Sequence, residues 1–417
     1  MREGWAKTKL KELCVIQPPK KEARRLLGDE ELVSFVPMSN VGICQKQLQL
    51  DSARPLGEVA GSYTYFADGD VLLAKITPCF ENGKLGIASG LTNGIGFGSS
   101  EFIVLRSNGS IDPEFLFYLL SQDKFRVAGS KVMTGAVGHK RVPIEFLENQ
   151  DICLPPLSEQ SRIVTILDEA FAGIETAVAN TEKNLANARE LFESYLNSVF
   201  SRRGEGWVEI EINDVCESII DCVNKTAPQV TYPTPFKMIR TTNVRNGRIS
   251  LDSVRYVTEE TYRIWTRRQI PRKGDVILTR EAPMGEVGII DTDDKIFLGQ
   301  RLVSYRANPE RLNSRFLLYA FQSNFIQAQI AALASGSTVQ HMRVPDSKKL
   351  MLRVPDLKTQ SEVVDSLDLL RDETQRLQSI YQQKLTALAE LKQSLLQKAF
   401  SGELTGATDP LKDEKVA

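Results

Sequence analysis

The chain of 417 residues has few of the residues that build compact chemical sites. Its six cysteines are scattered and form no CxxC pair, which argues against both a disulfide framework and a zinc site. We interpret them as small buried apolar residues. No apolar run approaches the roughly 20 residues that cross a bilayer, and the first residues lack the apolar stretch of a signal peptide. These absences predict a cytoplasmic protein that does not contact a membrane.

Sequence signatures of catalysis are also missing. We find no GxxxxGKS/T phosphate loop, no HExxH, no GxSxG, and no glycine-rich turn after a first strand of the kind that dinucleotide folds use. The only two histidines, His139 and His341, lie in polar loops without a nucleophile and an orienting group beside them. We expect them to contact phosphate or base, with a structural role as the alternative. The sequence therefore predicts no catalytic residue, no metal site and no cofactor.

Charge is unevenly distributed along the chain. The net charge of −1 does not suggest a nucleic-acid binder. Between Lys237 and Lys273, however, ten Lys and Arg residues stand against three acidic ones, a local balance of +7. Because a charge acts within about one Debye length in salt solution, a local basic face is what matters for contact with phosphate.

What the sequence does contain is a duplication. LPPLSEQSRIVTILD at 154–168 matches VPDLKTQSEVVDSLD at 354–368, with seven of fifteen residues identical and no gap at a spacing of 200. The segments ending in NSVFS and QKAFS, at 201 and 401, agree at the same spacing. The chain is therefore a tandem of two similar halves.

Each half has the same order of elements. GWAKTKLKELC and GWVEIEINDVC open the halves and place Cys14 and Cys216 at equivalent positions. Two apolar strands follow, FVPMSNV and DGDVLLAKITP in the first half, FKMIRTTNV and KGDVILTREAP in the second, with Gly-Asp turns before the latter of each pair. A glycine-spaced loop, a further strand, a helix with aromatic residues and a polar loop complete each half. This order predicts a mixed α+β domain, made twice.

A long helix is expected after each domain. Pro155 and Pro156 cannot lie inside a helix, and Ser158 is the expected N-cap. Apolar residues then recur at steps of three and four over some 40 residues without proline, in both halves. A stripe of this length predicts a coiled coil, about 60 Å long at 1.5 Å per residue. The pairing should be antiparallel, because the first helix must deliver the chain to the second domain.

Polar loops in each half carry residues suited to duplex DNA. Such recognition needs phosphate contacts and a few side chains at base edges, where Arg and Lys suit guanine and Asn and Gln suit adenine. In the first half the candidates are Asn40, Lys75, Thr77, Asn82, Lys84, His139, Lys140 and Arg141. In the second half they are Arg240, Thr241, Asn243, Arg245, Arg280, Glu281, Met284, Thr338, Gln340, His341 and Arg343. The two sets differ while the apolar frame agrees, as expected if each domain reads its own short sequence.

At the paired LPPLSEQ and VPDLKTQ segments, and at the ending LKQSLLQKAFSGEL, the chain resembles the specificity subunits of Type I restriction–modification enzymes. The resemblance spans nearly the whole length. It implies a fold of two target-recognition domains separated by two long helices that form an antiparallel coiled coil. The expected boundaries are 1–153 and 204–353 for the domains, 154–203 and 354–402 for the helices, and 403–417 for a flexible tail.

The resemblance also implies a function and partners. Each domain would bind one half of a bipartite site in double-stranded DNA, and the helices would fix the spacer between the halves. Two modification subunits, which bind S-adenosylmethionine and methylate adenine, would dock around the helices, together with two ATP-using restriction subunits. The residues alone leave two alternatives open: a DNA-modifying enzyme with unfamiliar motifs, and a coiled-coil scaffold that does not touch DNA.

Overall fold

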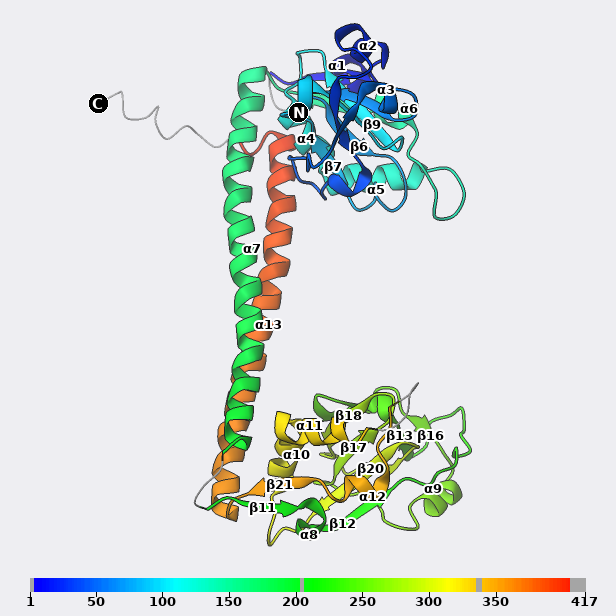
Figure 1. The fold of residues 1–417 in the computed structure, drawn as a ribbon, viewed down its shortest axis with the longest axis vertical. Helices are drawn as coiled ribbons and strands as arrows, with labels where there is room; N and C mark the ends of the chain where they lie inside the picture. The colour runs from blue at the N-terminus through cyan, green and yellow to red at the C-terminus, as the bar shows by residue number, and fades with distance from the viewer. Residues whose placement is uncertain (1–3, 203–205, 335–339, 406–417) are drawn as a thin grey trace, which may run out of the picture. The chain divides into compact units, whose positions relative to one another are not determined.

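The computed structural model describes residues 4–202, 206–334 and 340–405. These residues form two compact units, which divide inside two long helices, between Thr181 and Glu182 and between Gln382 and Gln383 (Figure 1). Unit 1 contains the first domain and unit 2 the second. Among the described residues, every helix is too short or too polar to serve as a membrane span. The tail predicted over 403–417 lies outside the described residues from position 406 onward.

Unit 1 is built on two four-stranded sheets. The main sheet has the order β2-β9-β6-β7, with strands at Cys14–Ile16, Phe102–Ser107, Val71–Ala74 and Leu85–Ile87. The second sheet has the order β4-β3-β8-β5, with strands at Ala53–Pro55, Leu32–Val36, Ile95–Gly98 and Thr64–Ala67. A short antiparallel ribbon, β1 (Ala6–Lys9) with β10 (Asp151–Leu154), joins the start of the domain to its end.

Short helices surround the sheets of unit 1. They are α1 (Leu10–Leu13), α2 (Lys21–Leu26), α3 (Leu56–Val59), α4 (Pro113–Leu120), α5 (Asp123–Val132) and α6 (Ile144–Glu148), with 3-10 turns η1 (Met38–Asn40) and η2 (Thr92–Gly94). The aromatic residues of α4 are almost completely buried, in a core cluster that also contains residues of both long helices. The aromatic helix predicted from the sequence is therefore the link between sheet and coiled coil.

Unit 2 repeats this plan with an extended main sheet. Its six strands follow the order β12-β20-β17-β18-β15-β14, at Cys216–Asp221, Leu302–Ala307, Val276–Arg280, Met284–Ile289, Gly247–Ile249 and Val244–Arg245. The second sheet is β16-β13-β19, at Arg255–Tyr256, Phe236–Ile239 and Lys295–Leu298. The closing ribbon pairs β11 (Val208–Glu211) with β21 (Met351–Val354).

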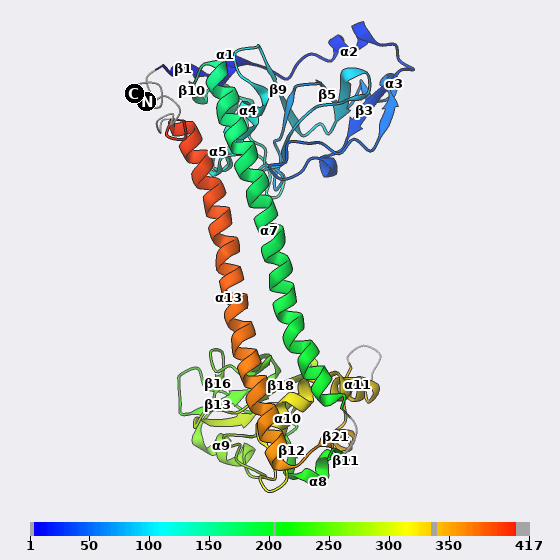
Figure 2. The same cartoon turned by 90° about the vertical axis from the view of Figure 1, so that its left-hand side faces the viewer.

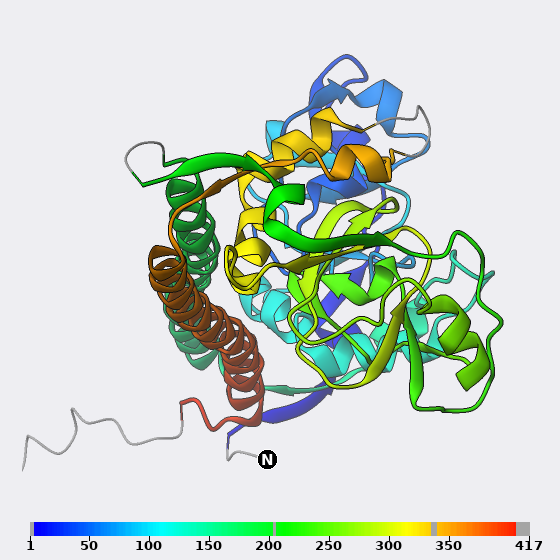
Figure 3. The ribbon, with the colours of Figure 1, turned by 90° about the horizontal axis from the view of Figure 1, so that it is seen from below.

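The helices of unit 2 correspond to those of unit 1. They are α8 (Ile212–Val215), α9 (Glu259–Trp265), α10 (Ser314–Gln322), α11 (Asn324–Ala332) and α12 (Val344–Ser347), with the 3-10 turn η3 (Thr241–Asn243). Helix α10 lies between the strands of the main sheet and the two long helices (Figure 3). Its Phe316 and Tyr319 contact Phe200 and Phe192 of the first long helix, with ring centroids 5.1 and 6.2 Å apart.

The topology confirms that the two domains are copies of one fold. In unit 1 the strand β3 pairs parallel with β8 and antiparallel with β4. In unit 2 the strand β13 pairs in the same two ways with β19 and β16. The main sheets also agree, since β6 lies between β7 and β9 as β17 lies between β18 and β20.

The long helices are α7 (Leu157–Phe200, 44 residues) and α13 (Leu357–Ser401, 45 residues). In unit 1 the first part of α7 packs against the last part of α13, where Lys392 Nζ lies 4.7 Å from the centroid of the Phe171 ring. In unit 2 the last part of α7 and the first part of α13 contribute residues to one core cluster. Figure 2 shows these two helix ends in unit 2. The beginning of one helix therefore meets the end of the other in each unit, and the predicted antiparallel pairing is confirmed.

The start of each long helix differs slightly from the sequence prediction. The N-cap expected at Ser158 is wrong, because α7 already begins at Leu157 and the Pro156 carbonyl accepts hydrogen bonds from the next turn. In the second copy, Asp356 replaces this proline. Its carboxylate accepts the backbone N–H groups of Lys358 and Thr359, at 2.9 and 3.0 Å. A charged cap of this kind stabilises the first turn of a helix.

Candidate nucleic-acid interface

In unit 1, two loops that are 60 residues apart in the sequence meet at one end of the main sheet. Lys75 and Thr77 follow β6, and the polar loop 134–141 lies beside them. The Thr77 N–H donates to the Lys140 carbonyl at 2.9 Å, and Ile76 forms a β-bridge with Arg141. The fold thus brings together five predicted residues, Lys75, Thr77, His139, Lys140 and Arg141.

The equivalent ends of unit 2 are joined in the same way. Glu281 forms a β-bridge with His341, and the Met342 N–H donates to the Arg280 carbonyl at 3.1 Å. The Arg280 guanidinium donates in return to the Met342 carbonyl at 3.0 Å. Gln340 is exposed next to this bridge. The candidate Thr338 lies outside the described residues.

An ion pair holds these loops in place in each unit. The residue directly before the neighbouring strand is acidic in unit 1 and basic in unit 2. In unit 1 the Arg141 guanidinium donates two hydrogen bonds of 2.8 Å to the Glu101 carboxylate. These bonds lower the pKa of Glu101 below its ordinary value. In unit 2 the residue equivalent to Glu101 is Arg301, whose guanidinium lies 3.2 Å from the Glu281 carboxylate. The same position is therefore braced by opposite charges, which gives the two loop pairs different electrostatics.

The polar turns after β3 and β13 contain predicted residues that are buried. Asn40 and Asn243 are 9% and 1% exposed. Their Nδ2 atoms donate to the carbonyls of Gln49 and Ser250, at 2.9 and 3.1 Å. Both amides hold the turn that leads away from the strand, which is a structural role. The identity of this Asn in the two halves was a sequence signal for such a role.

Arginines beside the turn in unit 2 remain accessible. Arg240 and Thr241 are half-buried, and Arg245 donates to two carbonyls of the same turn, at 3.0 and 2.8 Å. Burial and the neighbouring Arg255 lower the pKa of Arg240. Two guanidinium groups that repel one another in this way form a surface that favours an anion.

The remaining candidates lie around the turns between the central strands and at the loop ends. Asn82 is exposed, while Lys84 donates to the Met38 carbonyl at 2.7 Å. Met284 is half-buried and packs against the core of unit 2. Arg343 is exposed and forms an ion pair within its own turn, 2.7 Å from Asp346.

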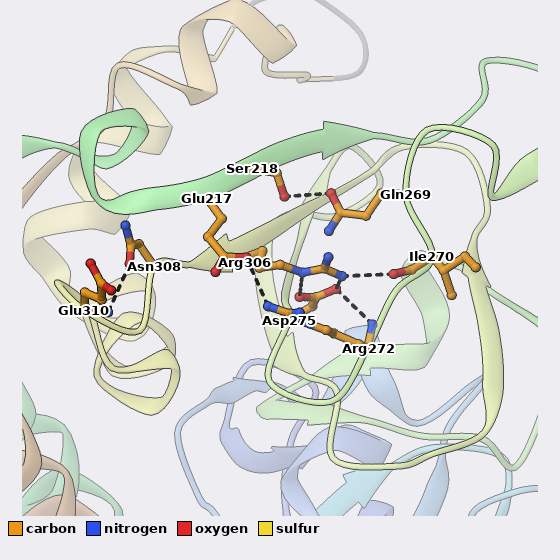
Figure 4. Close-up of polar contacts among 9 residues, drawn as sticks. All are labelled: Glu217, Ser218, Gln269, Ile270, Arg272, Asp275, Arg306, Asn308 and Glu310. Atoms are coloured by element: carbon orange, nitrogen blue, oxygen red, sulfur yellow. Dashed lines mark hydrogen bonds and ion pairs between the residues drawn. The ribbon is translucent and has the colours of Figure 1, made fainter.

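Behind the loops, a buried ion pair fixes the central strands of each unit. Asp275 lies directly before β17 and is 1% exposed. Its carboxylate accepts two hydrogen bonds of 2.8 Å from Arg306, which also donates to the Ile270 carbonyl (Figure 4). Asp70 and Arg106 form the same pair in unit 1, with two bonds of 2.7 Å. The repeated Gly-Asp was visible in the sequence, but its distant arginine partner was not.

The repeated Gln of the Leu-Pro motif ties each long helix to its domain. Gln160 is fully buried, and its Oε1 accepts the Asp112 N–H at 2.7 Å while its Nε2 donates to the carbonyls of Ser110 and Pro155. Gln360 makes the three corresponding bonds in unit 2.

A second contact between domain and helix lies about two turns further along each long helix, and it is also the same in both units. The hydroxyl groups of Tyr118 and Tyr319 donate to the carboxylates of Asp168 and Asp368. Because both junctions are made by buried or half-buried polar pairs, the angle between domain and helix is well defined within each unit.

Catalysis would need convergent metal ligands or an activated nucleophile. Among the described residues, no three His, Cys, Asp or Glu side chains converge as metal ligands. Burial raises the pKa of the Cys14 and Cys216 thiols to about 12, which keeps both protonated and poor nucleophiles. Cys14 is the small buried residue that the sequence predicted, whereas Cys216 is half-buried.

Fold and loops together define a protein of two homologous α+β domains joined by an antiparallel pair of long helices. The chain belongs to the family of Type I restriction modification DNA specificity domains, whose model matches it twice, at residues 2–184 and 204–385.

Individual relatives support this assignment. The chain is 36% identical over 212 residues to the Type I restriction enzyme EcoEI specificity subunit of Escherichia coli, and 32% identical over 238 residues to the EcoAI specificity subunit. These alignments cover 46% and 55% of this chain but only 35% and 40% of the relatives, so the chain spans well under two thirds of either protein.

Solved structures show the same fold. A structure from a study of complex assembly and conformational transition of the type I R-M system aligns with a TM-score of 0.77 and 20% identity, over 97% of this chain and 99% of that chain. The HsdS subunit from Thermoanaerobacter tengcongensis aligns with a TM-score of 0.66 and 19% identity, over 97% and 98% of the two chains.

Proposed function

We propose that this chain is the DNA sequence-recognition subunit of a Type I restriction–modification complex. The observation that carries the proposal is the double match to the specificity-domain family. In each matched domain, a β-bridge joins two polar loops at one end of the main sheet. In this proposal residues 1–153 and 204–353 are target-recognition domains, and each reads one half of a bipartite site in double-stranded DNA. A cytoplasmic location is part of the same proposal.

The loops at the ends of the central strands are proposed to contact DNA. Lys75, His139 and Lys140 in unit 1 and Arg280, Gln340 and Arg343 in unit 2 have the chemistry to reach base edges or phosphates. Arg141 and Glu281 are engaged in the bracing ion pairs and are proposed to act through loop position. The other candidate residues are proposed to form the rest of the DNA-contacting surface. They are Thr77, Asn82, Lys84, Arg240, Thr241, Arg245, Met284, Thr338 and His341. Asn40 and Asn243 support the turns that present it.

The subunit itself is proposed to be non-catalytic and to need no cofactor. Methylation and ATP-dependent restriction would come from two modification and two restriction subunits. Exposed leucines on the long helices support docking of a partner in two copies. Leu157 and Leu357 are 51% and 37% exposed, and Leu191 and Leu391 are 51% and 46% exposed. Each pair is identical at the 200-residue spacing although much of each side chain lies on the surface.

The helix pair is proposed to set the spacer between the half-sites. Gln160 and Gln360 fix each domain to the start of a helix, so helix length should be transmitted to the domains. Inserting four residues into each helix lengthens it by about 6 Å, close to two base pairs at a rise of 3.4 Å. Inserting seven residues adds about 10.5 Å, close to three base pairs, and preserves the heptad stripe.

The test is to map methylated sites in cells that carry the wild-type subunit or an insertion variant with its partner subunits. Residues 184 and 384 are suitable insertion points, because the two copies share no identity in the segment that ends there. We expect a bipartite site with unchanged halves and a longer spacer. An insertion of equal length at the exposed Ser89–Gly90 turn serves as the control and should leave the spacer unchanged. A spacer that stays the same in both helix variants would refute the helix proposal.

Two measurements on purified protein discriminate the two alternatives. If the chain is an enzyme, the purified chain alone should turn over DNA with Mg²⁺ or a methyl donor, which our proposal does not expect. If it is a scaffold that does not touch DNA, no sequence-specific and salt-dependent binding of duplex should occur with the partner subunits present.

A further inference from the structure

The loop of residues 134–141 in unit 1 presents an apolar side chain to solvent. Val137 is 92% exposed, far more than the valines that line the helix beside it, Val127 at 55% and Val132 at 43%. The residues at the two ends of the loop, Met133 and Val142, are buried in the core of the unit. The exposure of Val137 is therefore a property of the loop tip.

The tip is a defined turn on a braced stem. Thr134 and Arg141 exchange two backbone hydrogen bonds, of 3.0 and 2.8 Å. At the tip, the His139 N–H donates to the Ala136 carbonyl at 2.9 Å, and Gly138 has φ +82°. This is a type II β-turn with Val137 at its first corner, where a side chain points outward. A side chain at Gly135 would meet the His139 carbonyl at 2.9 Å, so the stem also requires its glycine.

The chemistry of the tip restricts what it can recognise. Gly135, Ala136, Val137 and Gly138 have no side-chain donor or acceptor, so these side chains cannot form hydrogen bonds with a base edge. The next two residues, His139 and Lys140, are exposed and polar and are suited to phosphate. In the major groove the one apolar group on a base edge is the C5 methyl of thymine, which small apolar side chains contact.

We propose that Val137 is a specificity-determining residue that contacts a thymine methyl group in the half-site read by unit 1. This inference rests on the proposed function. It assigns the tip of the loop to base recognition and the polar residues behind it to the backbone. The loop is closed by the β-bridge between Thr134 and Arg141, so it is narrow enough to enter a major groove about 12 Å wide.

The experiment uses the full chain in complex with its modification subunits and a duplex that carries the mapped site. Each thymine is replaced in turn by deoxyuridine, which lacks only the C5 methyl group, and Kd is measured for wild type, Val137→Ala and Val127→Ala. At one thymine we expect the wild type to bind about fourfold more weakly after replacement, the effect of one buried methyl group. Val137→Ala should bind the thymine duplex about fourfold more weakly and lose the sensitivity to uracil at that position.

The matched control Val127→Ala changes the same residue type on the neighbouring helix and should behave as wild type throughout. The inference is overturned if no thymine in the site matters to the wild type, if the site contains none, or if Val137→Ala keeps the full sensitivity to uracil. A wild-type complex that shows no sequence-specific binding would instead overturn the proposed function, and the inference with it. Because Val137 is on the surface, its replacement should leave the thermal unfolding of the chain unchanged.

Discussion

The junction between domain and helix can be tested by the replacement of Gln160 by Met. Met has nearly the same volume, so no cavity forms, but it cannot make the hydrogen bonds to Ser110, Asp112 and Pro155. Three backbone groups lose their partner, one in a buried hydrogen bond and two in partly buried ones. At the low end of about 1 kcal/mol for each unsatisfied group, the free energy of unfolding of unit 1 should fall by roughly 3 kcal/mol.

The assay is urea unfolding followed by tryptophan fluorescence. The chain has three tryptophans, and Trp5 is the one in unit 1. In a background with Trp207→Phe and Trp265→Phe, the signal reports unit 1 alone. With a urea m-value of about 3 kcal/mol per M, the midpoint should fall by roughly 1 M. Gln397→Met, at an exposed position of α13 in the same unit, is the control. A shift for Gln160→Met no larger than for this control would refute the reasoning.

Three further measurements test the interior of the units. Iodoacetamide at pH 8 should leave Cys14 and Cys216 unmodified in the native chain and alkylate both in urea, as read by mass spectrometry, because burial holds their pKa near 12. Alkylation of either cysteine in the native chain as fast as in urea would contradict its burial. The pKa of Glu101 is lowered, so its ion pair contributes stability above the ordinary value of 4.5 and loses it as the pH falls through the lower folded value. The stability difference between wild type and Glu101→Gln should thus be present at pH 6 and smaller at pH 3.5, and a constant difference would exclude this linkage. Asp275→Ala removes a buried carboxylate and should destabilise unit 2 by about 3 kcal/mol, whereas Asp294→Ala, in an exposed pair, should cost less than about 1 kcal/mol.

The sequence predicted the elements of the fold well because they depend on periodicity and turn chemistry. The Gly-Asp turns precede β6 and β17, and the proline-free stripes became α7 and α13. These signals are local, so one chain was enough to find them. The duplication added an independent check, since each prediction had to hold twice.

Contacts between distant loops could not be predicted in this way. Nothing in the sequence indicates that Ile76 pairs with Arg141, or that Arg141 is bound to Glu101. Loop residues have no periodicity, and a charged side chain looks the same whether it faces an acid or solvent. For the same reason Val137 was not among the candidate residues, because its importance depends on an exposure that only the turn geometry defines.

Comparison of the two halves separates structural from variable positions better than residue type does. Two pairs of polar residues that are identical in both copies, Asn40 with Asn243 and Gln160 with Gln360, are buried and hydrogen-bonded to backbone. The equivalent pair Lys75 and Arg280 differs, and both residues lie at the strand ends. For these pairs identity accompanies a structural role, and the difference lies in the loops that are proposed to contact DNA.

The attachment of the helix and the variable residue Lys75 lie at opposite ends of the same strands, which explains how the loop can vary independently of the attachment. Asp70 lies directly before β6, and the antiparallel neighbour β9 ends beside it and leads to the loop that Gln160 holds. Lys75 follows the other end of β6, about 17 Å away for five residues of extended chain. The buried Asp70–Arg106 pair fixes the strands on the helix side. Substitutions in the loops on the far side should thus leave the attachment to the helix intact. Under the proposed function, a change of recognised sequence would therefore not require a change of spacer.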